Sequence, residues 1–271
     1  MRSQLFFLSF TLILLQHFVG LSQSQNQVGL TAGMSYYLGD LNETGHFKKA
    51  NTNFAWGIVH RFPINDRFTW KNSILFAKIT GDDNQSESQI KKNRNLNFET
   101  NINEFSTQFE FNFLPYHSFV IRHHFSPYIF AGAALFWFTP TTALNGNVYN
   151  LREYRTEGQP EEYKKMQFAI PFGVGLKFKL NHRILFAVEY GIRKTFTDYL
   201  DDVSTTYPDD PSSMSTVSQA LSNRSLDNGN KQNEWGMQRG NSQRKDLYTM
   251  TSFTMLIRIG KHPNLCRYNT Q

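Results

Sequence analysis

The sequence predicts an all-β protein, an eight-stranded antiparallel up-and-down transmembrane β-barrel of the outer membrane. Three observations predict it: long segments alternate with a period of two, one face of these segments is apolar, and the connections between them are alternately short and long. Soluble strands average about five or six residues, whereas a tilted membrane-spanning strand needs about nine to eleven with one apolar face. The segments here match the second class.

Composition excludes several other classes of protein. The chain has 271 residues, of which 18% are charged and 15% aromatic, and its mean hydropathy is −0.48. A polytopic helical membrane protein would be apolar overall, and a disordered chain would be poor in aromatic residues. The net charge of +6 comes from scattered residues, so the sequence predicts no nucleic-acid partner.

The first residues have the layout of a secretory signal peptide. Arg2 precedes an apolar stretch over residues 5–19, and small and polar residues follow at 20–25. About 15 apolar residues fall short of the roughly 20 that a spanning helix needs. We therefore expect residues 1–22 to be a cleaved export signal and residues 23–271 to form one barrel domain.

Three segments show the alternation most clearly. In residues 166–180 every second residue is bulky and apolar, from Met166 to Leu180, while Gln, Gly, Lys and other residues lie between them. Residues 105–113 and 184–192 repeat this pattern. Each is predicted to be a strand with one face toward lipid.

Weaker alternation predicts five more strands, which makes eight. Two of these segments, near Phe68 and Tyr128, are apolar on both faces, so the pattern does not orient them. Short connections follow the second and sixth strands, and one of intermediate length follows the fourth. Long polar connections follow the first, third, fifth and seventh, as in barrels with short periplasmic turns and long extracellular loops. The five weaker segments are 28–37, 54–62, 68–79, 128–138 and 247–259.

The main alternative is a soluble β-sandwich or lipocalin-type barrel. Such a protein would bury its Phe-rich face and leave a polar exterior. The bulky apolar face opposed by Gly, Ser, Thr and charged residues favours lipid outside.

The polar faces of the strands place charges in the barrel interior. An eight-stranded barrel is filled by side chains, which disfavours a wide solute pore. Buried charges must be paired or hydrated, so we expect a structural polar plug in which Glu189 contacts Arg193, Lys177 or Arg258. The predicted plug residues are Glu110, Lys177, Glu189, Arg193 and Arg258.

Acidic residues mark the predicted outer rim of the barrel. They follow the first strand, the third strand at Asp82 and Asp83, and the seventh strand, and basic residues precede the last strand. The pattern leaves three interpretations: solvated rim charges, which it favours, a salt-bridged latch, or a divalent-cation site built from loop oxygens. The rim residues are Asp40, Asp198, Asp201, Asp202 and Arg239.

Signatures of enzymes and cofactors are missing from the sequence. Gly173 and Gly175 lie inside a predicted strand without a third glycine or a following helix, so they do not form a dinucleotide loop. We predict no catalytic residue, no cofactor, no metal and no small-molecule substrate. The single cysteine, Cys266, lies in a predicted periplasmic tail over residues 261–271. It is either a free thiol, which the sequence favours, or a contact to a periplasmic partner.

Several motifs resemble the PorG family, the outer-membrane barrels of the type IX secretion system of Bacteroidetes. The most specific is EYGIRKTFTDYLDDVSTTY (189–207), and within it residues 193–204 carry most of the likeness. The others are GMSYYLGDLN (33–42), TGDD (80–83), PYIFAGAALFWFTP (127–140) and RGN (239–241). The fourth long loop looks longer than is usual for the family.

The resemblance implies a non-enzymatic component of a protein secretion machine. It also implies partners, namely outer-membrane lipid and a periplasmic ring of PorK- and PorN-like proteins, and it implies no cofactor. Two other functions stay open: a surface barrel for adhesion or envelope integrity that acts through its long loops, and a rim enzyme acting on lipid.

Overall fold

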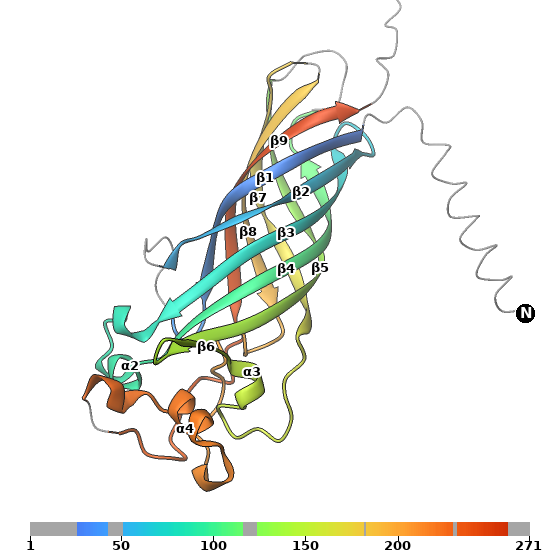
Figure 1. Cartoon of the computed structure of the whole chain (residues 1–271). Coiled ribbons are helices and arrows are strands. Elements are labelled where there is room, and N and C mark those ends of the chain that lie inside the picture. Colours follow the sequence, from blue (N-terminus) through green and yellow to red (C-terminus); the bar gives the residue numbers. More distant parts are fainter. Residues whose placement is uncertain (1–25, 43–50, 116–123, 182, 230–231, 260–271) are drawn as a thin grey trace, which may run out of the picture.

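The protein is a closed antiparallel β-barrel with a small folded region at one end (Figure 1). The computed structural model describes residues 26–42, 51–115, 124–181, 183–229 and 232–259. The predicted signal peptide, the tail after residue 259 and Cys266 lie outside them. The strands are β1 (Asn26–Leu38), β2 (Asn53–Pro63), β3 (Phe68–Asp82), β4 (Asn97–Asn112), β5 (Phe125–Leu144), β6 (Asn147–Asn150), β7 (Met166–Lys179), β8 (Ile184–Thr195) and β9 (Leu247–Ile259).

Eight of these strands form the ring, which confirms the predicted fold class. Neighbours pair in the order β4-β3-β2-β1-β9-β8-β7-β5, and a further ladder between β4 and β5 closes the ring. Strand β6, which the sequence did not predict, is a short hairpin arm paired to the end of β5.

The period-two alternation sets which side chains face out. On β7, Phe172 and Val174 point outward, and Val174 is 55% exposed. Gly173 and Gly175 point inward, where a Cβ on Gly175 would lie 2.4 Å from the ring of Tyr128. Glycine at 175 therefore makes room in the lumen for a large aromatic side chain.

An apolar belt surrounds the barrel. Outward aromatic side chains of adjacent strands stack on one another, as with Trp56 and Phe76, whose ring centroids are 4.7 Å apart, and Phe186 and Phe253 at 5.3 Å. Burying such a surface in lipid is favourable, whereas exposing it to water is unfavourable. Other exposed members of the belt include Leu30, Phe54, Ile58, Ile74, Phe105, Phe109, Ile129, Leu135, Trp137, Phe168, Val188, Met255 and Ile257.

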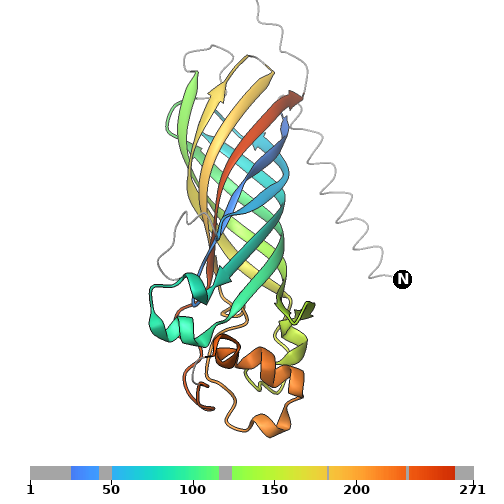
Figure 2. The ribbon, with the colours of Figure 1, turned by 60° about the vertical axis from the view of Figure 1, so that its left-hand side comes forward.

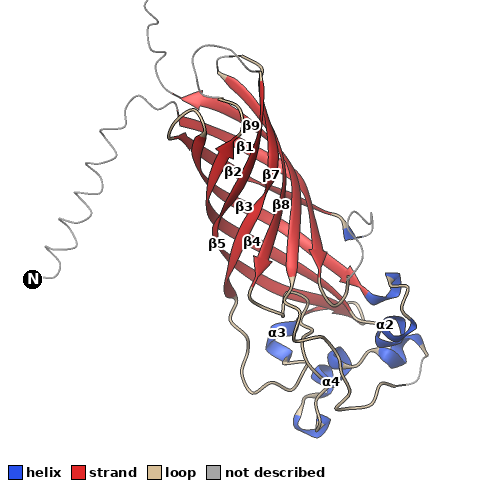
Figure 3. Cartoon of the chain, turned by 180° about the vertical axis from the view of Figure 1, so that it is seen from behind, coloured by secondary structure: helices blue, strands red, loops and turns tan. Residues whose placement is uncertain are grey.

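The connections sort by length between the two ends of the barrel. Residues 64–67, 113–124 and 180–183 connect strands at one end, and residues 39–52, 83–96, 145–165 and 196–246 connect them at the other. Figures 2 and 3 show the helices gathered at the long-loop end. We call the described residues of the four long connections, with β6, the cap.

Short helices build much of the cap. They are η2 (Asp83–Gln85), α2 (Gln89–Arg94), α3 (Leu151–Tyr154), η3 (Pro211–Ser213), α4 (Thr216–Ser222) and η4 (Ser225–Asn228). Among the described residues, no helix has both the length and the apolarity to cross a membrane.

Strands β3 and β4 run further toward the cap than the predicted segments 68–79 and 105–113. The outward residues in the extended part of β4 are polar: Glu99 pairs with Lys78 at 2.5 Å, and Asn101 is exposed. Backbone pairing continues beyond the apolar belt, where an outward face no longer needs apolar residues. Apolar alternation alone could not detect this extension.

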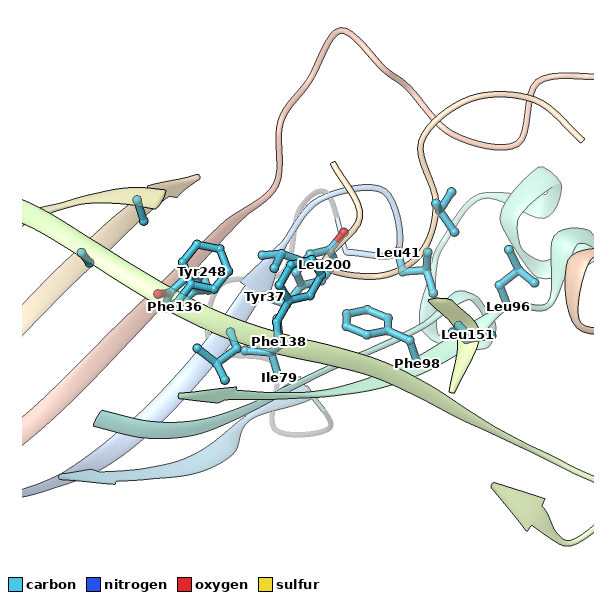
Figure 4. Packing of buried hydrophobic residues seen from close by; sticks show 14 of the residues in the cluster. Tyr37, Leu41, Ile79, Leu96, Phe98, Phe136, Phe138, Leu151, Leu200 and Tyr248 are labelled. Atoms are coloured by element: carbon cyan, nitrogen blue, oxygen red, sulfur yellow. The ribbon is translucent and has the colours of Figure 1, made fainter. Parts of the chain in front are cut away.

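One apolar core joins the barrel interior to the cap (Figure 4). Barrel side chains at the long-loop end meet leucines contributed by all four long connections, so the cap packs onto the barrel. The barrel members include Tyr37, Ile79, Phe98, Phe136, Phe138 and Tyr248, and the cap members include Leu41, Leu96, Leu151, Leu200, Val203 and Leu221.

Candidate functional site

A buried ionic network fills the lumen toward the short-turn end. Glu110 lies at its centre and is fully buried: Arg61 Nε donates to it at 2.8 Å and Lys177 Nζ at 2.5 Å. We call this set the lower network, and its members are Arg61, Lys71, Glu110, Tyr128, Lys177 and Glu189.

Glu189 has other partners than those expected. It accepts hydrogen bonds from Arg61, from Lys71 Nζ at 2.9 Å and from the Tyr128 hydroxyl at 2.5 Å. Lys177 on β7 instead contacts Glu110 on β4. The partners come instead from β2 and β3, whose charged residues Arg61 and Lys71 were not among the predicted plug residues. The segment that holds Lys71 is apolar on both faces, so the sequence did not orient it.

Lysine ammonium groups in the lower network also lie over aromatic rings. Lys71 Nζ is 4.3 Å from the centroid of Phe130, and Lys177 Nζ is 4.4 Å from that of Tyr128. Cation–π attraction strengthens when the charge is desolvated. In the network, three cationic side chains therefore pair with two carboxylates, and aromatic rings stabilise the lysines further.

A second ion pair lies between the lower network and the apolar core. Arg193 Nε donates to Glu104 Oε2 at 3.2 Å, and the Tyr248 hydroxyl donates to the same oxygen at 2.7 Å. Arg258, the last predicted plug residue, faces inward on β9 and is partly buried. From the short-turn end to the cap, the lumen thus holds ions, then a paired arginine, then apolar side chains.

Arg239 connects two long loops inside the cap. Its Nη1 lies 3.1 Å from Glu157 Oε1 and 2.5 Å from the Asp202 carbonyl oxygen, and it is 3% exposed. Glu157 also accepts hydrogen bonds from the backbone N–H of Ser204 and Thr205. One buried arginine and one buried glutamate therefore organise the cap.

Asp202 sits in a strained but well-supported conformation. Its φ is 64°, in the left-handed region that disfavours residues other than glycine. Its carboxylate accepts hydrogen bonds from the hydroxyls of Thr156 and Tyr163. Burial raises the pKa of Asp202 to about 6, although Arg239 opposes this shift.

A tyrosine hydroxyl bridges two buried carboxyl groups where the barrel meets the cap. Tyr37 Oη lies 2.5 Å from Asp201 Oδ2 and 2.8 Å from Asp246 Oδ1. Burial raises the pKa of Asp201 and of Asp246 well above the ordinary range, and their mutual repulsion raises the pKa of Asp246 further. Because one hydroxyl has one proton, the trio is satisfied when a carboxyl carries a second proton.

A second arginine connects the first and second long loops to the last. Arg94 forms a two-point ion pair with Asp83, with both oxygens at 2.7 Å, and donates to the Arg239 carbonyl oxygen at 2.5 Å and the Asp40 carbonyl oxygen at 3.3 Å. The backbone N–H of Asn241 donates to the Asp40 carboxylate at 2.8 Å. These contacts make the cap one packed unit.

The favoured interpretation of the rim charges as solvated is wrong. The predicted rim residues are all buried, because the fourth loop folds over the barrel mouth. Asp198 lies 3.9 Å from Lys245 and Arg239 lies near Asp202, which matches the latch alternative in part. Within the described part of the chain, no group of three or more His, Cys, Asp or Glu side chains is arranged to hold a metal ion.

Several residues of the site were missed by sequence reasoning. Arg61 and Lys71 lie on weakly alternating segments, and Arg94 and Glu157 lie in long loops that the sequence treats as plain polar connections. A signal was present for the first two, since both are charges within a predicted strand. No sequence signal marked the loop residues, because ion pairs between distant loops produce no periodic pattern in the sequence.

A known protein family covers most of the chain. The family DUF6089, described as a domain of unknown function, matches residues 4–217. The chain belongs to the DUF6089 family. The match includes all strands of this DUF6089 barrel except β9, and it includes the start of the fourth long loop with Asp198, Asp201 and Asp202.

Solved structures with similar folds are small barrels of low sequence identity. Ail of Yersinia pestis, solved with the heparin analogue sucrose octasulfate, is 10% identical with a TM-score of 0.41, covering 87% of this chain and 99% of Ail. Neisserial surface protein A is 9% identical with a TM-score of 0.41, covering 86% and 97%. OprG from Pseudomonas aeruginosa is 8% identical with a TM-score of 0.41, covering 89% and 99%.

These scores lie below 0.5, so the fold of the DUF6089 barrel rests on its own strand pairing. Among curated proteins, none matches the sequence significantly.

Proposed function

We propose that the protein is a non-enzymatic outer-membrane component of a protein secretion machine of type IX. In this role it is a sealed anchor that contacts partners through its two ends, and solutes do not pass through its lumen. The observation that carries the proposal is the filled lumen described above. A porin of this size would need an open polar channel, but eight strands enclose little more than their own side chains.

The apolar belt supports the outer membrane as the site of this anchor. Only helices and closed barrels satisfy their backbone hydrogen bonds in lipid. The ring of eight strands is closed by the β4–β5 ladder, and its outward side chains between the polar ends are predominantly apolar.

The PorG-like run over residues 193–204 supports the secretion role. It begins at Arg193, whose guanidinium pairs with Glu104 in the lumen, and continues through Asp198, Asp201 and Asp202, which are buried residues of the cap. The residues that carry the resemblance are therefore the ones that join the barrel to its cap. We propose that the same architecture serves the same class of machine.

Periplasmic ring proteins of the PorK and PorN type are the proposed partners. With the long loops outside, the surfaces available to them are the three short turns at 64–67, 113–124 and 180–183, together with the tail over residues 261–271 that contains Cys266. The tail and the second turn's residues 116–123 lie outside the described residues.

A surface role in adhesion or envelope integrity is the second candidate. One observation favours it: the cap is a folded unit with its own core and buried ion pairs, as expected of a loop region that presents a defined surface. Secretion through periplasmic partners gives no special reason for such a cap.

Crosslinking in native envelopes, followed by affinity purification of the mature protein, tests the proposal. Heat-modifiable gel mobility checks that the barrel is folded. Recovery of a PorK-like lipoprotein and a PorN-like protein is the expected result, and it should be lost when residues after 260 are deleted. Two results together would contradict the secretion role and favour the surface role. The folded barrel would be recovered without partners, and cells that lack the barrel would still secrete normally.

A further inference from the structure

Four inward side chains form a row across adjacent strands near the short-turn end of the lumen. The strand register pairs Lys71 of β3 with Arg61 of β2, and Arg61 with Gln27 of β1. Gln27 in turn pairs with Arg258 of β9. Directly paired residues have Cβ atoms about 4.5–5.5 Å apart, and like charges at such positions repel. This set, which we call the basic row, thus holds three cations, one amide and no carboxylate.

Carboxylates on other strands compensate only part of this charge. Glu110 on β4 accepts hydrogen bonds from Arg61 and from Lys177 on β7. Glu189 on β8 pairs with Arg61 and Lys71. Three cations therefore share two carboxylates, before the last cation of the basic row is counted. Excess charge in the interior of a protein is costly, so the lumen favours a further negative charge at this row.

Arg61 meets both carboxylates with one edge of its guanidinium group. Its Nε donates to Glu110, and its Nη2 donates to Glu189 and to the Tyr128 hydroxyl. Nη1 lies on the other edge and has no hydrogen-bond partner among the described residues, although Arg61 is fully buried. The two N–H groups of Nη1 are therefore donors that neither carboxylate satisfies.

The neighbouring amide has a similar deficit. Gln27 is 1% exposed, and its Nε2 makes no hydrogen bond within the part of the chain that the structure describes. Because Gln27 is the register partner of Arg61, two buried groups with unsatisfied N–H donors lie on neighbouring positions of the lumen wall. Leaving buried donors unpaired costs free energy, so an acceptor is favoured beside them.

The sequence near this end of the barrel offers no further carboxylate side chain for the lumen. In the short turns at 64–67, 113–124 and 180–183 the single acidic residue is Asp66, which is exposed. Residues 260–271 contain neither Asp nor Glu. The acceptor that the donors favour is therefore expected to come from solution.

We propose that the lumen binds a small monovalent anion, with chloride as the test case, at Arg61 Nη1 and Gln27 Nε2. The anion compensates the excess positive charge of the basic row and completes the packing of the sealed lumen. A water molecule would accept the same hydrogen bonds without compensating the charge. The inference goes beyond the proposed function and needs no partner protein, so either can fail alone.

Urea unfolding of the purified full-length barrel in neutral lipid vesicles tests the proposal. Sodium chloride is exchanged for sodium gluconate, which has a much larger anion, at constant ionic strength. A ligand that binds only the folded state stabilises it increasingly as its concentration rises. Above the dissociation constant, we expect the urea midpoint to rise by roughly 0.5–1 M for each tenfold increase in chloride.

Gln27→Glu places a carboxylate at the position where the anion is expected. This variant should unfold at the same urea midpoint in both salts, and in gluconate it should be at least as stable as the wild type. Gln167→Glu, which adds the same charge at the long-loop end of β7, is the matched control and should keep the dependence on chloride. Heat-modifiable gel mobility checks that each variant is folded.

A second measurement leaves the protein unchanged. Crystals grown in sodium bromide should give an anomalous peak within hydrogen-bond distance of Arg61 Nη1 or Gln27 Nε2. Equal urea midpoints of the wild type in chloride and gluconate, or an ordered lumen without such a peak, would overturn the proposal and leave water as the acceptor. Dependence on chloride that persists in Gln27→Glu would also overturn it.

Discussion

Arg239 donates through Nη1 to Glu157 Oε1 at 3.1 Å, and both side chains are buried. The two residues lie in different long loops, 82 positions apart in the sequence. Breaking a buried ion pair by removing one partner costs more than the pair contributes, because the other charge stays buried without its counterion. The stability of the cap should therefore depend on this pair while that of the barrel should not.

Arg239→Ala should loosen the cap and leave the barrel folded. We expect the fourth loop to be cleaved much faster by added protease, with unchanged heat-modifiable mobility, because the uncompensated Glu157 costs roughly 3–5 kcal/mol. Arg244→Ala, an exposed residue of the same loop, is the matched control. Equal cleavage of the two variants would show that the pair does not hold the cap.

Acidic pH should stabilise the cap. Burial raises the pKa of Asp202 from its ordinary 3.8 to about 6. A carboxyl with a raised folded pKa contributes stability that is fully present below the unfolded value and is lost as pH rises through the folded value. The stability of the cap should therefore fall as pH rises from about 4 to 6. The loss of unfolding free energy from Asp202 is roughly 1–3 kcal/mol.

Hydrogen exchange of the fourth loop, corrected for intrinsic rates, measures this effect. Protection should fall between pH 4 and 7 in the wild type and fall less in Asp202→Asn. Asp210→Asn, an exposed change in the same loop, should keep the wild-type profile. A flat profile in the wild type would count against the account.

Glu110→Ala should destabilise the barrel. The change removes the carboxylate that pairs with buried Lys177 and one of the two that pair with buried Arg61, at a cost of roughly 3–5 kcal/mol in unfolding free energy. Glu99→Ala on the same strand faces outward beside Lys78, and an exposed pair of this kind contributes at most about 1 kcal/mol. Urea titration in lipid vesicles compares the two, and equal midpoints would refute the structural role of the lower network.

A charge in the apolar belt should hinder membrane insertion. Val174→Lys places an ammonium group on the exposed outward face of β7 and should cost roughly 2–4 kcal/mol if that face lies in the hydrocarbon core. Asn101→Lys, on an outward position beyond the belt, should be nearly neutral. Folding yield into vesicles distinguishes them, and an equally small effect at both positions would mean that the belt does not face lipid.

The barrel was predictable because alternation is a local property. The apolar residues from Met166 to Phe178 indicated one lipid face, and β7 has the predicted bounds to within a residue or two. Glu189 was correctly expected on the inward face of β8, but its partners Arg61 and Lys71 come from weakly alternating segments. The segment of Lys71 is apolar on both faces, so the pattern could not orient it.

The cap was not predictable by the same reasoning. Its fold depends on pairs such as Arg94 with Asp83 and Arg239 with Glu157, and no period in the sequence connects their loops. The sequence analysis therefore placed the charges of the fourth loop in solvent, but the structure buries them. Polarity of a loop segment is a poor guide where each polar group has a buried partner.

The central claim is that the lumen is sealed, and conductance across a planar lipid bilayer tests it most directly. The purified full-length barrel is inserted, with insertion verified by protease protection, and current is recorded at high salt. The account predicts no conductance above that of the protein-free membrane. A steady conductance that scales with the number of inserted barrels would contradict it.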